Sequence, residues 1–160
     1  MKTSERTQIL LVSVFVIICS VSAIYLWNLP DNEQDVVIDP TNKKSVVLGK
    51  TVYAKHCASC HGAKLEGQPN WKQRLPNGRL PAPPHDATGH TWHHPDKLLF
   101  KMTKYGPASL LPEGQYQSDM PGLKGVLSDD EILASLAYIK STWPKEIQNR
   151  HDQINARVPR

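Results

Sequence analysis

Residues Cys57-Ala58-Ser59-Cys60-His61 place two thiols on either side of a two-residue spacer, with an imidazole directly after the second thiol. This spacing is the attachment signature of c-type haem. Each sulfur can add across one vinyl group of the ring, and a helical turn brings both sulfurs to the ring edge. His61 then lies against the ring face and can give a nitrogen ligand to the iron. The stretch therefore predicts one haem c, covalently bound through Cys57 and Cys60.

Half of a zinc site is the alternative interpretation of two closely spaced cysteines. A structural zinc site normally needs two more cysteine or histidine ligands at paired spacing. The chain has three cysteines and no second C-x-x-C pair, and Cys19 is the only cysteine outside the motif. Haem attachment is therefore favoured over zinc.

Further stretches around and after the motif carry a resemblance to a known family. Residues 56–62, Asp119-Met120-Pro121-Gly122-Leu123 and residues 127–132 together resemble class I c-type cytochromes. The resemblance covers about residues 46–143, and 63–94 match the pattern poorly. It implies an all-α class I cytochrome c fold, with helices and long loops around one haem. It also implies an electron carrier rather than an enzyme.

Met120 is the residue expected to bind the other side of the iron. A thioether presented from an extended loop can reach the sixth coordination position, and Pro121 stiffens the approach. The other candidates are Met102 and the histidines between 85 and 94. Met102 lies on the apolar face of a predicted helix, so a place in the core is favoured for it. The predicted iron ligands are therefore His61 and Met120.

The segment from His85 to His94 is rich in histidine, which suits copper or zinc as well as iron. A loop that leads into a helix at Pro95 is the favoured interpretation. Upstream of it, a prolyl carbonyl of Pro69, Pro81 or Pro83 could accept the second N–H of the proximal imidazole and fix its ring. Four side chains are candidate hydrogen-bond donors to the haem propionates: Trp71, Arg74, Arg79 and Trp92. For the two arginines, the alternative is a solvated charge on a loop.

An apolar run from Ile9 to Leu26 predicts a transmembrane helix. Its 18 residues would span about 27 Å, close to the hydrocarbon thickness of a bilayer. Lys2 and Arg6 precede the run and predict a cytoplasmic N-terminus. The following domain would then lie on the extracytoplasmic, periplasmic side of a single-pass anchor in the cell membrane.

A cleaved signal peptide is the alternative for the same run. Val21-Ser22-Ala23 would be an acceptable cleavage site, but the apolar residues continue beyond it to Leu26. An uncleaved anchor is therefore favoured. Both interpretations place the domain in the compartment where c-type haem is attached.

The chain is expected to divide into a short leader, an anchor, a linker, one domain and a tail. Within the domain we expect helices over 46–57 and 95–105, and a last helix that Ser128 begins with a capping box. The resemblance implies that Gly49 and Tyr53 pack against Tyr138. The tail is either a short helix or disordered. The predicted divisions are 1–8 (cytoplasmic N-terminus), 9–27 (transmembrane anchor), 28–45 (linker), 46–144 (cytochrome c domain) and 145–160 (polar tail).

The charge pattern excludes one class of partner. The formal net charge is +4, but lysine and arginine are scattered, so nucleic-acid binding is not expected. A His/Met pair leaves no open iron position, which predicts electron transfer between extracytoplasmic proteins of a respiratory chain. Its partners would be a quinol-oxidising complex, a terminal oxidase or a dehydrogenase, steered by lysines such as Lys64, Lys72, Lys104 and Lys124. The alternatives are a haem subunit of a larger membrane oxidoreductase or oxidase complex, and a haem sensor or enzyme whose distal ligand dissociates.

Overall fold

The structure is a computed structural model that describes residues 11, 13, 15, 18 and 36–158. The chain forms two compact units, residues 1–33 and 34–160. The predicted anchor over 9–27 and most of the predicted linker lie outside the described residues, apart from four helical positions between 11 and 18. Among the positions that are described, no helix is long and apolar enough to cross a membrane.

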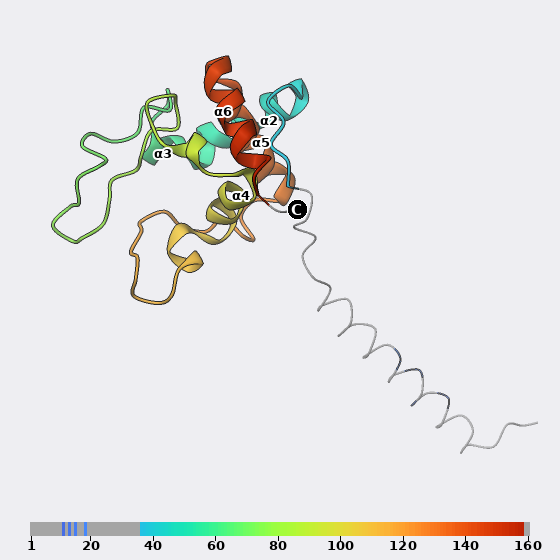
Figure 1. The fold of residues 1–160 in the computed structure, drawn as a ribbon. Helices are drawn as coiled ribbons and strands as arrows, with labels where there is room; N and C mark the ends of the chain where they lie inside the picture. The colour runs from blue at the N-terminus through green and yellow to red at the C-terminus, as the bar shows by residue number, and fades with distance from the viewer. Residues whose placement is uncertain (1–10, 12, 14, 16–17, 19–35, 159–160) are drawn as a thin grey trace, which may run out of the picture. The chain divides into compact units, whose positions relative to one another are not determined.

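The second unit is helical, as the all-α expectation requires (Figure 1). Within residues 36–158 there is no β-strand, only an isolated bridge between Lys124 and Leu127. Long loops separate α3 from η2 and η3 from α5. The elements in chain order are α2 (Lys43–His56), α3 (Ala58–His61), η2 (Thr91–His93), α4 (Asp96–Tyr105), η3 (Pro107–Leu110), α5 (Asp129–Ser141) and α6 (Lys145–Asn155).

Helix α2 begins at Lys43, ahead of the predicted start at residue 46. The reason is the side chain of Asn42, which accepts a hydrogen bond from the backbone N–H of Ser45 at 3.2 Å and caps the helix. Just before the cap, Ile38 is 2% exposed and belongs to the core. The end of the predicted linker is therefore an extended piece that packs on the domain.

Helices α2 and α5 cross in close contact at Gly49. A Cβ atom at that position would lie 1.8 Å from the carbonyl oxygen of Ala134, so only glycine permits the approach. One turn further along α2, the ring of Tyr53 lies 5.6 Å from the ring of Tyr138. The contact between Tyr53 and Tyr138 is the one that the resemblance implied, while Gly49 lies against Ala134 and Ser135.

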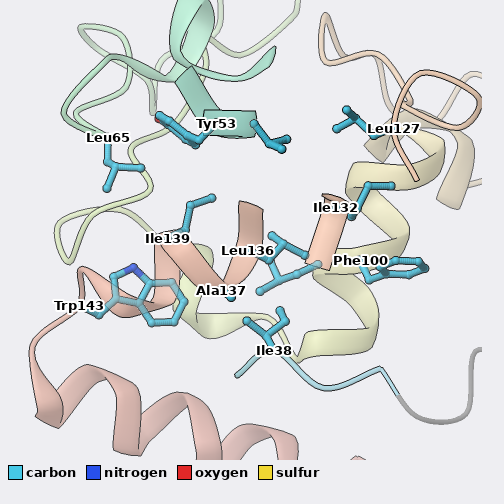
Figure 2. Close-up of a cluster of buried hydrophobic side chains, with 12 residues drawn as sticks. Ile38, Tyr53, Leu65, Phe100, Leu127, Ile132, Leu136, Ala137, Ile139 and Trp143 are labelled. Carbon is cyan, nitrogen blue, oxygen red and sulfur yellow. The ribbon is translucent and has the colours of Figure 1, made fainter. Parts of the chain in front are cut away.

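Helix α5 supplies the largest part of the hydrophobic core. Its start is a complete capping box, in which Ser128 Oγ accepts from the N–H of Glu131 and the Glu131 carboxylate accepts from the N–H of Ser128. An apolar stripe along this helix faces inward, and Figure 2 shows most of it among the core side chains. Its members are Ile132, Leu136, Ile139 and Trp143, which are buried, and Leu133, which is partly buried.

Helix α4 follows its predicted bounds but buries a different face. In the sequence, Leu98, Leu99, Met102 and Tyr105 share an apolar helix face, but only Leu99 among them is buried. The buried residues are Asp96, Leu99, Phe100, Thr103 and Lys104.

Lys104 corrects a further expectation, because this lysine was predicted to lie at the surface. Its ammonium group is almost fully buried and pairs with the carboxylate of Asp129 at 3.0 Å. It also lies 5.3 Å from the centre of the Phe100 ring. Lys104 therefore holds α4 against the start of α5 and is not available to steer a partner.

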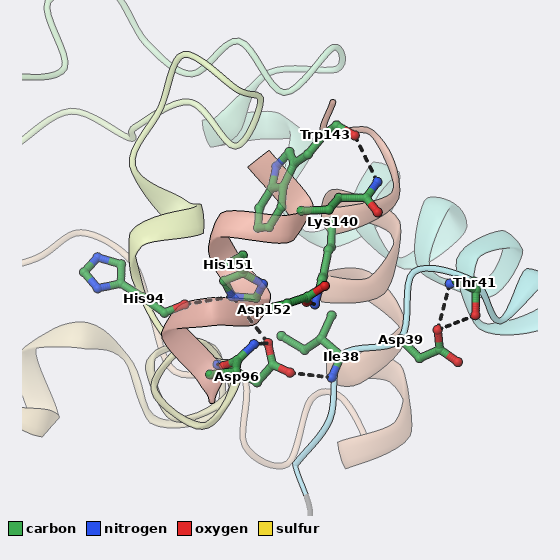
Figure 3. Close-up of polar contacts among 11 residues, drawn as sticks. Ile38, Asp39, Thr41, His94, Asp96, Lys140, Trp143, His151 and Asp152 are labelled. Carbon is green, nitrogen blue, oxygen red and sulfur yellow. Dashed lines mark hydrogen bonds and ion pairs between the residues drawn. The ribbon is translucent and has the colours of Figure 1, made fainter. Parts of the chain in front are cut away.

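Helix α6 decides between the two alternatives left open for the tail. The imidazole of His151 is fully buried, and its Nε2 atom donates to the carbonyl oxygen of His94 at 2.9 Å (Figure 3). The buried ammonium group of Lys140 pairs with Asp152 at 2.7 Å. The tail is thus a helix that packs on the domain through polar side chains.

Candidate functional site

The five-residue motif forms a single helical turn, as predicted. Cys57 ends α2, and its carbonyl oxygen accepts from the N–H of Cys60 at 3.1 Å and of His61 at 2.9 Å. Both motif cysteines are free thiols, Cys57 half-buried and Cys60 exposed. Two sulfurs from one turn, with His61 directly after them, provide the arrangement that thioether attachment needs.

The environment of Cys57 keeps its sulfur protonated. Burial, followed by the nearby Cys60, raises the pKa of the Cys57 thiol to about 11.

His61 is buried and oriented by the carbonyl oxygen of Pro83. The Nδ1 atom lies 2.9 Å from that oxygen, so Nδ1–H donates and Nε2 is left for a metal. Pro83 is one of the three prolines predicted for this role. Burial, opposed by this hydrogen bond, lowers the pKa of His61, which favours the neutral imidazole that metal binding requires.

His85 is the residue at this site whose role the sequence did not predict. Its ring stacks on the ring of His61, with centroids 3.9 Å apart and planes inclined by 24°. The sequence showed a cluster of histidines, which suggested a metal site or a rival iron ligand. Among the residues that the structure describes, no group of three or more His, Cys, Asp or Glu side chains could hold a metal ion.

Met120 lies on a separate loop that is fixed to the end of α4. Its backbone N–H donates to Ser118 Oγ at 3.1 Å, and its carbonyl oxygen lies 3.4 Å from where a Cβ of Gly106 would be. Shortly after it, the N–H of Leu123 donates to the carbonyl of Thr103 at 3.0 Å. The structure thus brings the two cysteines and His61 together on one turn and places Met120 on its own anchored loop.

A buried polar atom without a hydrogen-bond partner marks a side chain that could bind a haem propionate. The indole N–H of Trp92 is buried and has no hydrogen-bond partner within the described part of the chain. A donor of that kind fits an acidic propionate. The two arginines are used differently, since Arg74 donates to the carbonyl of Gly78 and Arg79 pairs with Asp119. The free thiols, His61 and Trp92 fit the group, whereas the arginines bridge loop segments.

Comparison with known proteins agrees with this geometry. The model of the cytochrome c family matches residues 46–143. No curated protein gave a match. Among solved structures, the chain is similar to cytochrome cL of the marine methylotrophic bacterium Methylophaga aminisulfidivorans MPT, at 22% identity over 75% of this chain and 69% of that chain, with a TM-score of 0.46. Since the family model spans more than half of the chain and includes the motif, the chain belongs to the cytochrome c family and is a class I c-type cytochrome with haem c bound covalently through Cys57 and Cys60.

Proposed function

We propose that this cytochrome is a membrane-tethered electron carrier whose iron is held by His61 and Met120. It would pass electrons between extracytoplasmic partners of a respiratory chain. Bound haem supplies an iron that accepts and releases an electron, at a potential that methionine ligation raises. The observation that carries the proposal is the 2.9 Å contact between His61 Nδ1 and Pro83 O, because it occupies Nδ1 and leaves Nε2 as the nitrogen that can bind iron.

The His61 side of the site is built to keep one ligand in place. The ring is 7% exposed, its Nδ1–H is satisfied, and both neighbouring cysteines tether the same turn. Tyr53 strengthens that turn, because its hydroxyl donates to the carbonyl of Gly62 at 2.8 Å. A ligand that is buried and bonded in this way is not readily exchanged for water.

The Met120 side of the site rests on an anchored loop. Two backbone hydrogen bonds, from Leu123 and Lys124 to the last turn of α4, hold the loop at 3.0 and 2.8 Å. A Cβ at Gly122 would lie 2.6 Å from the backbone carbon of Tyr105, so the loop runs directly against the helix. Fixed anchoring favours a permanent ligand over one that opens for substrate.

Attachment to the membrane rests on the sequence. The apolar run from Ile9 to Leu26, preceded by Lys2 and Arg6, supports a single anchor with the cytochrome domain in the periplasm. On the domain itself, Lys64, Lys72 and Lys124 are exposed and could attract acidic partner surfaces. Detergent extraction tests the tether and also distinguishes a free carrier, which is recovered alone, from a subunit of a complex, which is recovered with fixed partners.

Two methionine variants test the proposed ligation. Met120→Ala should open the iron to carbon monoxide and lower the reduction potential by on the order of 100 mV. Met102→Ala is the matched control, since Met102 is half-buried beside the core and should change only stability. The proposal is wrong if Met120→Ala keeps the Met–Fe(III) charge-transfer band, or if Met102→Ala removes it.

A further inference from the structure

The stacked pair of His61 and His85 assigns a role to a residue in the histidine-rich segment. We propose that His85 is a positioning residue, whose buried ring holds the plane of the His61 imidazole and so sets its orientation on the iron. The inference rests on the proposed function, in which His61 is the proximal ligand.

The stacking geometry fits a support and does not fit a second ligand. The two rings are 3.9 Å apart and inclined by 24°, so His85 lies face to face beside His61. A face-to-face contact places the His85 ring beside the His61 ring rather than in line with Nε2, and there it can limit rotation of the His61 ring.

The position of His85 is fixed by contacts from three parts of the chain. Its Nδ1 atom is hydrogen bonded to Oγ1 of the buried Thr91 at 2.8 Å. Its backbone N–H donates to the carbonyl of Leu65 at 2.8 Å. Its carbonyl oxygen accepts from the indole N–H of Trp143, just after α5, at 2.8 Å. The backbone of His85 is thus held through both its N–H and its carbonyl, and its ring is oriented by the hydrogen bond to Thr91.

The same short segment acts on His61 in two complementary ways. The carbonyl of Pro83 holds the His61 ring at its edge, through Nδ1. The flat ring of His85 lies against the face of the same ring and adds a second restraint on its plane. Because Pro83 and His85 are two residues apart, one rigid stretch sets both the position and the plane of the ligand.

The consequence should appear in the electronic structure of the oxidised iron. The plane of an axial imidazole determines how the iron orbitals split, and outer contacts of this kind tune a metal without supplying a ligand. Loss of the stack should therefore change the magnetic spectrum while both iron ligands stay in place. A purely structural role in folding would leave that spectrum unchanged.

Four variants of the oxidised, haem-loaded protein test the inference by electron paramagnetic resonance and by the proton shifts of the haem methyl groups. His85→Leu removes the flat ring and should shift the g values and the methyl resonances. His85→Phe retains a flat ring and should return both toward the parent spectrum. Thr91→Val keeps the His85 ring but removes its hydrogen bond to Nδ1, together with the longer one from Oγ1 to the carbonyl of Pro84, and should give a smaller shift than His85→Leu. His93→Leu is the control, because His93 is exposed and stacks on Trp92 instead.

The outcomes separate this inference from the proposed function. A His85→Leu protein that folds and has the parent g values and methyl shifts overturns the positioning role, while His/Met ligation stands. If His85→Leu does not fold, the test rests on the Thr91→Val and His85→Phe proteins. The role is refuted if the spectra of Thr91→Val equal those of the parent protein while the spectra of His85→Phe differ from them. If a His85 variant loses one axial ligand altogether, His85 is itself a ligand, and both the inference and the His61/Met120 assignment are wrong.

Discussion

The Nε2 atom of His151 lies 3.3 Å from Oδ1 of Asp96, and both side chains are buried (Figure 3). The Asp96 carboxylate also accepts from the backbone N–H of Ile38 at 2.9 Å and from the side-chain amide of Asn155 at 3.0 Å. One carboxylate at the start of α4 therefore connects the beginning of the domain with its last helix. The polar tail is part of the folded unit for this reason.

The buried His151 should make the stability of the domain depend on pH. Burial and the nearby Lys140 lower the pKa of His151 below its ordinary value of 6.5, although Asp96 and Asp152 oppose this. The unfolded chain then binds a proton as the pH falls through about 6.5, whereas the folded chain binds it only at a lower pH. The free energy of unfolding should fall as the pH is lowered from 7 to 5, by up to about 1.4 kcal/mol per pH unit for this proton.

Replacement of the imidazole isolates this contribution. His151→Gln retains a side-chain donor toward the carbonyl of His94 but cannot be protonated, so urea unfolding at several pH values should show a shallower slope. His93→Gln is the control, because His93 is exposed and should retain the parent slope. Equal slopes for His151→Gln and the parent protein would contradict the assignment.

The start of the domain should be needed for stability. Ile38 is 2% exposed within the core, and its neighbour Val37 is 68% exposed. Ile38→Ala should lower the free energy of unfolding by roughly 2–5 kcal/mol, whereas Val37→Ala should change it by less than about 0.5 kcal/mol. Chemical denaturation of the two variants measures both values. Similar effects from the two changes would show that the extended piece does not pack as described.

Gly49→Ala tests the crossing of α2 and α5. Alanine has a better helix propensity than glycine by up to about 1 kcal/mol, which alone would stabilise α2. The new Cβ would lie 1.8 Å from the Ala134 carbonyl oxygen, however, so the helices would have to separate. We expect a net loss of about 1–3 kcal/mol in the thermal or urea unfolding of the holoprotein. Lys50→Ala, at an exposed position of the same helix, is the control, and a stabilised Gly49→Ala protein would refute the close crossing.

Local sequence signals predicted the motif turn and α5 correctly, because each is determined by residues a few positions apart. The C-x-x-C-H spacing and the capping box between Ser128 and Glu131 both need only local contacts. Pro83 was one of three prolines whose carbonyl could accept the hydrogen bond from His61, and the fold places Pro83 there. The sequence alone does not show which of the three prolines lies beside His61, because that depends on how the loop folds back to the motif.

The features that the sequence did not predict depend on contacts between distant residues. Lys104 resembles a surface lysine until Asp129, 25 positions later, is placed beside it. Helix α6 has few apolar residues in its sequence. Polar groups of His151 and Asp152 attach it to the domain instead. His85 belonged to a cluster that suggested metal binding, and only the return of its loop to His61 gives it a different role.

The ion pair between Arg79 and Asp119 should restrain the ligand loop. It joins the long loop after the motif to the residue immediately before Met120. Both side chains are substantially exposed, so we expect a coupling of only about 0.2–1 kcal/mol, weakened by salt. A double-mutant cycle with Arg79→Ala and Asp119→Ala, read out as imidazole binding to the ferric iron, measures it. Arg74→Ala is the control, and a zero coupling at low salt would remove this contact from the account.

The identity of both axial ligands is the central claim, and near-infrared magnetic circular dichroism of the oxidised protein tests it most directly. The position of the charge-transfer band distinguishes His/Met from bis-histidine and from histidine with water. The account predicts a His/Met band in the oxidised protein that is lost in Met120→Ala, and no binding of carbon monoxide by the reduced parent protein. A bis-histidine band, or a band that persists in Met120→Ala, would contradict it.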